Sequence, residues 1–326
     1  MTEKIAILMA TYNGEKYIKE QLQSLINQTY RDFHIYIRDD GSTDHTIQEI
    51  EPFLDRFPDK ITLIKSHVNI GCRENFSKLI QLPIGEPYLM FCDQDDVWLP
   101  NKIQISLEKI KSVESVKGKH HPCLSFTDLV VVNDRLEWLS SSLWKYAQMN
   151  PAKTSLNHLL AENNIHGCTT IFNQALFKKI PSLPEGAHSH DWWLALVACA
   201  FGTIQPIYQP TILYRRHAST VTQASCVTFS MLFNKLLRLC KKVYRWPSGK
   251  KNPLIVKRQP LTVKQAKAFL ELHSSKLTEK QKKTLSVFAS LDNAGFFKKR
   301  MLIIRHRFWR NHFMKNLGLF ANGQFI

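Results

Sequence analysis

The sequence predicts an α/β protein with a mostly parallel sheet flanked by helices and with a basic helical extension at its C-terminus. Two observations carry this prediction. Short β-branched and apolar runs alternate with segments of helical period through residues 1–224. Positions 225–326 hold 22 of the chain's 44 Lys and Arg residues but only 3 of its 27 Asp and Glu residues. We therefore expect a nearly neutral body at 1–224 and a basic tail at 225–326.

Composition excludes several classes of protein. With 44% hydrophobic and 22% charged residues over 326 positions, the chain has the composition of a folded globular protein. No window approaches the roughly 18 uninterrupted apolar residues of a membrane-spanning helix. The N-terminus lacks the features of a secretory signal peptide. None of the seven cysteines forms a Cys-x-x-Cys pair, and most lie in apolar runs that favour reduced thiols. We expect a cytoplasmic location.

The first hundred residues are expected to hold four strands and the helices that connect them. Apolar, β-branched runs predict the strands at 4–10, 33–38, 61–66 and 87–92. Segments of helical period predict helices at 15–27, 43–57 and 74–82, and a further one beginning near Pro100. Ligands of such sheets bind outside the carboxyl ends of the strands. Polar motifs at those ends are therefore candidates for a binding site.

The rest of the chain is less regular. A strand is expected at 124–132, a loop at 138–149, a Gly-Cys-Thr-Thr-Ile-Phe run at 167–172 and an apolar helix at 194–201. In the tail we expect an amphipathic helix at 229–246, a loop at 247–260, and helices at about 262–273 and 278–290. A final apolar stripe of Phe297, Met301, Ile304 and Phe308 runs among basic residues.

Two acidic motifs end predicted strands. The carboxylates of Asp93-Gln94-Asp95-Asp96 would repel one another unless a cation lies between them, and their oxygens suit Mg²⁺ or Mn²⁺. Alternatively, Asp95 or Asp96 caps the helix near Pro100. By itself, Asp39-Asp40-Gly41-Ser42 indicates a tight turn with an Asx hydrogen bond.

Taken together, the motifs resemble the nucleotide-sugar half of family 2 glycosyltransferases. They are Ala10-Thr11-Tyr12-Asn13, Asp39-Asp40-Gly41-Ser42, Asn69-Ile70-Gly71 and Asp93-Gln94-Asp95-Asp96. The resemblance covers residues 4 to about 220 and is strong over the first 103. It implies a GT-A fold, which is a Rossmann-like sheet with a site for Mn²⁺ or Mg²⁺, in a catalytic domain at 1–224.

The resemblance implies nucleotide-sugar roles for Thr11, Tyr12, Asn13, Asp40, Arg73, Asp93 and Asp95. In the family, the segment matching 11–13 lines the nucleoside pocket. The carboxylate matching Asp40 accepts a hydrogen bond from the imide N–H of the nucleobase. Asp93 matches the aspartate near the ribose, and Asp95 matches the metal-binding aspartate beside the diphosphate. Ala10 departs from the family's usual Pro or Thr. Arg73 either reaches the nucleotide or is a solvated helix residue.

Asp191 matches the family's general base. Family members carry an acidic residue followed by Asp at the start of a helix, and His190-Asp191 stands in that place with His in the acidic position. An inverting transfer needs one carboxylate that takes the proton of the acceptor hydroxyl. On spacing alone, Asp191 is an N-cap for the following helix. Trp192 and Trp193 either stack on a sugar ring or are buried beside the helix.

Tyr214-Arg215-Arg216-His217 resembles a Tyr-Arg-x-His segment of rhamnosyltransferase-like members. The resemblance implies that His217 is a metal ligand or touches the diphosphate. It also implies that Arg215 or Arg216 neutralises the diphosphate leaving group.

The basic tail suggests a membrane surface. Basic amphipathic helices bind anionic membranes or nucleic acid, and the broad apolar face at 229–246 favours the membrane over nucleic acid. The alternative is that these faces pack on the catalytic domain. A tail lying on the inner face of the cell membrane would bring the active site to a lipid-linked acceptor.

The sequence thus predicts an inverting, metal-dependent glycosyltransferase of bacterial surface polysaccharide biosynthesis. Its donor would be dTDP-rhamnose or a UDP-sugar, and its acceptor a hydroxyl of a glycan, expected to be lipid-linked. One alternative is a sugar nucleotidylyltransferase, although the chain has Ala-Thr-Tyr-Asn-Gly where that class needs a glycine-rich phosphate loop with a basic residue. The other is a nucleic-acid-binding protein that acts through its tail.

Overall fold

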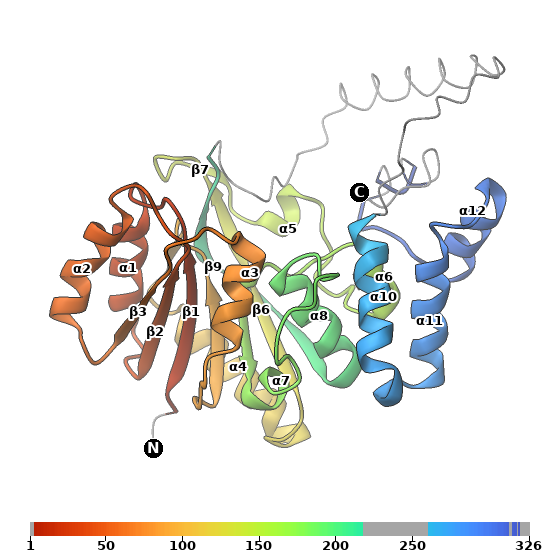
Figure 1. Ribbon diagram of the computed structural model, residues 1–326, viewed down its shortest axis with the longest axis horizontal. Coiled ribbons are helices and arrows are strands. Elements are labelled where there is room, and N and C mark those ends of the chain that lie inside the picture. The colour runs from red at the N-terminus through yellow and green to blue at the C-terminus, as the bar shows by residue number, and fades with distance from the viewer. Residues whose placement is uncertain (1–2, 218–259, 313–314, 318, 320–326) are drawn as a thin grey trace, which may run out of the picture.

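The computed structural model describes residues 3–217, 260–312, 315–317 and 319. Within these residues the chain forms three layers, with a central sheet covered by helices on both faces (Figure 1). The N-terminal half of the sheet is built from β1 (Ile5–Thr11), α1 (Ile18–Ile26), β2 (Phe33–Asp39), α2 (Thr46–Arg56), β3 (Ile61–Lys65), α3 (Cys72–Ile80) and β4 (Tyr88–Cys92). The order of strands and helices predicted for this half is confirmed.

The first two helices begin three residues later than predicted. The residues before them form turns that side chains tie to each other. Gly14 N donates to Thr46 Oγ1 at 2.7 Å, and Thr46 N donates to Asp44 Oδ1 at 3.0 Å. The N–H groups of Gly14 and Thr46 are thus paired with side chains in the turns. The helices begin only after these turns, at Ile18 and Thr46.

The second half of the body contains more elements than the sequence predicts. They are β5 (Val97–Trp98), α4 (Lys102–Lys117), β6 (Cys123–Val132), β7 (Trp138–Ser140), α5 (Leu143–Tyr146), α6 (Leu156–Ala161), η1 (Gly167–Thr169), β8 (Thr170–Asn173), α7 (Gln174–Phe177), α8 (His190–Phe201) and β9 (Thr203–Arg215). The expected loop at 138–149 contains β7 and α5, and the run at 167–172 divides into η1 and the start of β8.

The sheet is mixed rather than mostly parallel. Its order is β3-β2-β1-β4-β8-β6-β9-β5, and β7 pairs with β6. The β3-β2-β1-β4 half is parallel, as predicted, whereas β8 runs antiparallel to both of its neighbours. The prediction extended the strand–helix alternation of the first half to the second. There the helices in the connection from β6 to its neighbour β8 are only the short α5 and α6 and the 3₁₀ turn η1, and β8 returns antiparallel to β6.

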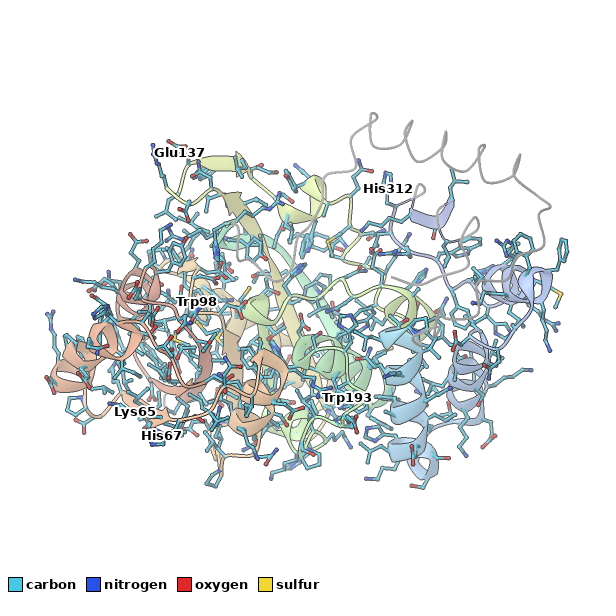
Figure 2. All side chains as sticks on the ribbon, turned by 45° about the horizontal axis from the view of Figure 1, so that its top comes forward. Lys65, His67, Trp98, Glu137, Trp193 and His312 are labelled. Carbon is cyan, nitrogen blue, oxygen red and sulfur yellow. The ribbon has the colours of Figure 1, made fainter. Side chains whose placement is uncertain are left out.

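Two hydrophobic cores lie on the two faces of the sheet. Along β1, Ile5, Ile7 and Met9 face the core made with α1, α2 and α4. Ala6 and Leu8 face the core made with α3, α6 and α8. This period-2 alternation is what the pleat of a strand covered on both faces requires. Figure 2 shows Trp98 of the first core and Trp193 of the second well apart.

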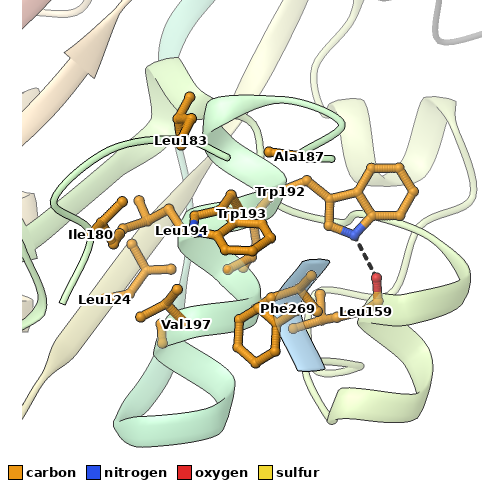
Figure 3. Close-up of a cluster of buried hydrophobic side chains, with 14 of the residues drawn as sticks. Leu124, Leu159, Ile180, Leu183, Ala187, Trp192, Trp193, Leu194, Val197 and Phe269 are labelled. Carbon is orange, nitrogen blue, oxygen red and sulfur yellow. Dashed lines mark hydrogen bonds between the residues drawn. The ribbon is translucent and has the colours of Figure 1, made fainter. Parts of the chain in front are cut away.

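The C-terminal helices pack on the second core. α10 (Leu261–His273), η2 (Ser274–Lys276), α11 (Glu279–Ser290) and α12 (Phe296–Arg305) follow one another, and the two predicted helices at about 262–273 and 278–290 are confirmed. Phe269 of α10 lies against Trp193 of α8, with ring centroids 5.2 Å apart (Figure 3). The predicted helix at 229–246, and all but the last residue of the loop at 247–260, lie outside the described residues. None of the helices in the described part of the chain combines the length and the apolarity needed to cross a membrane.

Candidate active site

The turns after β1 and β2 form one interlocked unit. Thr11 Oγ1 donates to Asp39 Oδ1 at 3.0 Å, and Asp39 Oδ2 accepts from the backbone N–H groups of Gly41 and Ser42. The N–H of Asn13, whose φ is 46°, donates to Ser42 Oγ at 2.9 Å. Asp39 therefore makes the Asx turn that the sequence indicates, and it holds the first two motifs together.

Gln94 fastens the acidic motif to the first turn. Its Oε1 accepts from Tyr12 N at 2.8 Å, and its Nε2 donates to Tyr12 O at 3.0 Å. A Cβ atom on Gly14 would come within 2.5 Å of Gln94 Oε1, so the close approach requires glycine. The Tyr12 ring remains 41% exposed at this edge. The sequence motifs therefore meet through backbone and amide contacts as well as through their carboxylates.

Asp40 joins the third motif to the end of β2. Its side chain is buried, and its Oδ2 accepts from Ile70 N at 3.1 Å and from Gly71 N at 2.8 Å. Arg38 donates to the other oxygen, Oδ1, at 3.2 Å. The predicted contact of Asp40 with a nucleobase stays a prediction, and in this structure the carboxylate holds the 69–71 segment in place.

The acidic motif combines buried and partly exposed carboxylates. Asp96 is fully buried and accepts from Arg215 N at 3.2 Å. Asp95 Oδ2 lies 2.9 Å from His217 Nε2, so the two predicted metal ligands are in contact. Burial, followed by the charges of Asp95 and Asp191, raises the pKa of Asp93 to about 7. Asp93 thus lies within electrostatic reach of both the motif and the candidate base.

Cys72 shows that the four predicted aspartates converge. Cys72 is the first residue of α3 and is exposed to solvent. Partial desolvation and then the charges of Asp93, Asp191, Asp40 and Asp95 raise the pKa of its thiol to about 12. Because charge–charge interactions fall off with distance, all four carboxylates lie in the neighbourhood of this thiol. The sequence analysis placed most of the cysteines in apolar runs and gave Cys72 no role, although its position directly after the Asn69-Ile70-Gly71 motif could have indicated its place.

Asp191 lies in the first turn of α8. The N-cap of α8 is Ser189 and not, as spacing alone had suggested, Asp191. Asp191 Oδ1 accepts hydrogen bonds from Ser189 Oγ and, at 2.7 Å, from Trp192 N. A carboxylate at this end of a helix is favoured by the helix dipole. The first turn of α8 therefore fixes the orientation of the predicted base.

His190 occupies an aromatic slot behind the predicted base. Its ring stacks on Phe76 with centroids 3.6 Å apart and meets Phe91 edge-on at 4.8 Å. Burial lowers the pKa of His190 to about 4, so the ring is neutral at physiological pH. A Cβ on Gly167 would lie 2.4 Å from His190 Nε2, so this position requires glycine. Two aromatic rings suit a neutral imidazole better than the carboxylate that the family usually has here.

Arg215 is buried among protein partners. Its guanidinium donates to Asp95 O at 2.9 Å and to Asp134 O at 2.8 Å, and it pairs with Glu20. Arg216 NH1 donates to Tyr146 Oη at 2.7 Å. Arg215 thus stabilises the acidic motif through its contacts with Asp95 and Asp96. The role of either arginine at a diphosphate stays a prediction.

Arg73 contacts the segment that precedes α8. Its guanidinium donates to the carbonyl oxygens of Glu185 and Ala187 and pairs with Glu74. The predicted contact of Arg73 with a nucleotide also stays a prediction. These bonds connect α3, at the predicted nucleotide side, with the segment that leads to Asp191.

Both tryptophans of the His-Asp-Trp-Trp run are buried. Trp192 Nε1 donates to Leu159 O, and Trp193 packs among Leu124, Val197 and Phe269 (Figure 3). The interpretation of these two residues as buried aromatics beside the helix is confirmed. They anchor α8, and with it Asp191, to the second core.

The acidic residues suit a divalent cation. Asp93, Asp96 and Cys168 place one ligand atom each within 4.8 Å of one another. Burial raises the pKa of the Cys168 thiol, so this side chain is protonated and a poor ligand for a hard ion. Carboxylate oxygens are the ligands that Mg²⁺ and Mn²⁺ prefer, and the mutual repulsion that raises the pKa of Asp93 would be relieved by a cation. Asp93 and Asp96 therefore supply carboxylates close enough to share such an ion, and the role of Asp95 and His217 as its ligands stays a prediction.

The pKa of Asp93 predicts how nucleotide affinity depends on pH. A carboxyl that titrates near pH 7 is largely neutral at pH 6 and ionised at pH 8, so it attracts a cation only at the higher pH. We expect the affinity for UDP or dTDP with Mn²⁺, measured by calorimetry, to rise severalfold from pH 6 to pH 8. Asp93→Asn should flatten that rise, and an equally steep rise in the variant would contradict the assignment.

The fold and site define a class of protein. A Rossmann-like half-sheet gathers acidic side chains at the carboxyl ends of its parallel strands, which is the arrangement of nucleotide-sugar-dependent transferases. Residues 6–180 match the model of Glycosyl transferase family 2. The chain belongs to this family, and it is therefore a glycosyltransferase that uses a nucleotide-sugar donor.

Individual relatives agree with this assignment. The chain is 30% identical over 249 residues to the dTDP-rhamnosyl transferase RfbG of Shigella flexneri, which covers 73% of this chain and 81% of that protein. It is 33% identical over 132 residues to an uncharacterized glycosyltransferase of Nostoc, across 40% of this chain and 39% of the relative. The crystal structure of S. aureus TarS 1–349 in complex with UDP-GlcNAc superposes with a TM-score of 0.51 at 16% identity, covering 98% and 92% of the two chains. The chain shares the GT-A-like fold of that protein.

Proposed function

We propose that the protein is an inverting glycosyltransferase that moves a sugar from a nucleoside diphosphate to a hydroxyl of a bacterial surface glycan. The observation that carries the proposal is that Asp40, Asp93, Asp95 and Asp191 all lie near enough to Cys72 to raise the pKa of its thiol. Three of these carboxylates come from the motifs at strand ends, and the fourth comes from the start of α8. This arrangement would bring the donor and the base to the same region.

In the proposed reaction, the acceptor oxygen bonds to the anomeric carbon from the face opposite the leaving group. The bond between that carbon and the diphosphate oxygen breaks, and its electron pair leaves with the nucleoside diphosphate. The hydroxyl proton passes to the Asp191 carboxylate. Ser189 and Trp192 hold that carboxylate through one oxygen, Oδ1.

The donor is held by the strand-end motifs in this proposal. Thr11, Tyr12, Asn13 and Asp40 would contact the nucleoside, and Asp93 would contact the ribose. Asp95 and His217 would hold a divalent cation. When bound, Mn²⁺ or Mg²⁺ supplies positive charge that stabilises the departing diphosphate. Arg216 and Arg73 are further candidates for contact with the phosphates.

We infer dTDP-rhamnose as the first donor to test and UDP-sugars as the second. The name of the Shigella relative supports the first, and the Tyr214–His217 segment resembles rhamnosyltransferase-like members. The test is a donor screen with purified full-length protein, with and without Mn²⁺, that measures the release of free nucleoside diphosphate. Metal-dependent release from one donor supports the proposal. A protein that releases pyrophosphate from a nucleoside triphosphate and a sugar phosphate would instead be a nucleotidylyltransferase.

We further propose that α12 lies on the anionic inner surface of the cell membrane, where a lipid-linked acceptor would be held. Phe297, Met301 and Ile304 are 84%, 53% and 54% exposed. At 3.6 residues per turn they fall within about 60° of one another, and the buried Ile303 points at least about 100° away from each of them. Lys298 and Arg305 lie on one side of this stripe and Arg300 lies on the other, and α12 has no acidic residue. An apolar stripe between cations matches an anionic bilayer surface.

Phe308 does not belong to the stripe that the sequence indicates. α12 ends at Arg305, and the chain then turns so that Phe308 is buried against Phe288, with ring centroids 4.9 Å apart. The exposed stripe is therefore confined to the helix. In Figure 1, α12 lies on the upper side of the molecule, toward which the parallel strands run.

Replacing Phe297, Met301 and Ile304 together by Ser should weaken membrane binding. Burial of three such side chains is worth several kcal/mol, at about 1.5–3 kcal/mol each when complete, so we expect at least a tenfold lower partition coefficient. Flotation with phosphatidylcholine vesicles, with and without phosphatidylglycerol, measures it. Val116→Ser, which removes an exposed apolar side chain of α4, is the control. A triple variant that floats like the wild type would contradict the role of α12, and wild-type binding to duplex DNA instead of vesicles would favour the nucleic-acid alternative.

A further inference from the structure

We propose that Gln265 of α10 is a positioning residue for the base Asp191, so that the C-terminal helices complete the active site. The proposal rests on the proposed role of Asp191. It concerns the segment from Pro181 to Ser189, which leads from the end of α7 into α8. This segment ends two residues before Asp191, so its position sets the position of the base.

Gln265 makes a direct contact with this segment. The backbone N–H of His188 donates to Gln265 Oε1 at 2.8 Å, and the Gln265 side chain is buried at 1% exposure. The next residue, Ser189, is the N-cap of α8 and donates its hydroxyl to Asp191 Oδ1. Two consecutive hydrogen bonds therefore connect α10 to the carboxylate of the base.

Glycine allows α10 to approach so closely. A Cβ atom on Gly186 would lie 2.7 Å from Ala268 Cβ and 3.2 Å from Lys264 O, both in α10. The neighbouring Ala187 is buried against the second core. The segment before α8 thus lies directly against α10, with no room for a larger residue at 186.

The opposite side of the same segment is held by α3. Arg73 donates to the carbonyl oxygens of Glu185 and Ala187, and Leu183 N donates to Ser77 Oγ at 3.2 Å. The segment is therefore clamped between α3, on the donor side, and α10. Loss of the Gln265 contact would leave the α3 clamp and the donor motifs in place. Loss of this contact would release only His188, which precedes the N-cap of α8.

The chain supplies a matched control. Gln281 of α11 also reaches from the C-terminal extension to the body, where its Nε2 donates to Ala200 O at 2.9 Å. That bond is made near the far end of α8, nine residues beyond Asp191. Gln281 connects the C-terminal helices to the end of α8, whereas Gln265 connects them to the segment that precedes Asp191.

The experiment compares Gln265→Met, Gln265→Glu and Gln281→Met in the full-length protein. Methionine keeps the size of glutamine, but its thioether sulfur is only a weak acceptor, whereas the carboxyl group of glutamate accepts a hydrogen bond as the amide oxygen does. A misplacement of a catalytic group by about 1 Å can cost about 10²-fold in rate. We expect Gln265→Met to lower kcat for nucleoside diphosphate release at least tenfold, with the Kd for UDP or dTDP plus Mn²⁺ unchanged. Gln265→Glu should recover activity, and Gln281→Met should keep wild-type kcat.

Hydrogen exchange gives a second readout that needs no acceptor. Gln265→Met should speed amide exchange in the peptide that contains His188, and Gln281→Met should not. Wild-type kcat in Gln265→Met would overturn the proposal, as would equal losses of kcat and Tm in both methionine variants. Full activity of Asp191→Asn would instead overturn the proposed base, whatever the result at Gln265.

Discussion

Replacing Asp191 by Asn is expected to abolish sugar transfer while leaving nucleotide binding nearly unchanged. The amide cannot take the proton of the acceptor hydroxyl, and loss of a general base typically costs about 10²–10⁴-fold in rate. Asn keeps the size of Asp, and its Oδ1 can still accept from Ser189 and Trp192. The orientation of the side chain should therefore survive the loss of its charge.

The measurement for this variant is the initial rate of nucleoside diphosphate release, together with calorimetric Kd values for UDP and dTDP with Mn²⁺. Asp55→Asn, which neutralises an exposed carboxylate on α2, is the control for the change of charge alone. Unaltered turnover in Asp191→Asn would refute the base assignment. A large loss of nucleotide affinity would show that Asp191 acts on the donor instead.

Replacing Asp95 by Ala should remove the dependence of nucleotide binding on metal. The carboxylate of Asp95 is partly exposed and contacts His217, which is the other predicted ligand. Without it the diphosphate would lose its counter-ion, and we expect the Kd for UDP or dTDP in the presence of Mn²⁺ to rise at least about tenfold. Binding without metal should change little.

Calorimetric titrations with Mn²⁺ and with a chelator separate these two quantities. Tm values for wild type and variant, both without metal, check that the fold is intact. A variant that keeps the wild-type difference between the two titrations would place the metal elsewhere. Asp93 and Asp96, with Cys168, would then be the next set to test.

The location of the site could be predicted from the sequence because parallel strands end at a common edge. The Asp40 and Asp93 motifs follow β2 and β4, and both strands pair with β1 in parallel register. Strand period and turn residues are local properties, so they identify these ends without any knowledge of tertiary contacts. Asp191 needed the family resemblance, since a lone aspartate at a helix start also fits a cap.

The supports of the site could not be predicted in this way. Gln265 and His188 are 77 positions apart, and His190 meets Gly167 through shape rather than through any local pattern. Arg215 shows the same limit for charge, because a cation beside an acidic motif suggests a phosphate ligand, whereas the fold buries it against Glu20 and two carbonyl groups. Such contacts depend on which elements become neighbours, and residue type alone does not determine that.

The central claim is that four aspartates surround one donor and its cation. The most direct test is a crystal structure of the protein with UDP or dTDP and Mn²⁺, in which anomalous scattering locates the metal. We predict one manganese ion bound by Asp95 and the diphosphate, with the nucleoside beside Tyr12 and Asp40. The Asp191 carboxylate should face the space beyond the terminal phosphate, where the donor sugar would lie. A nucleotide and metal bound away from Asp40 and Asp95, or an Asp191 directed into a separate region, would contradict the claim.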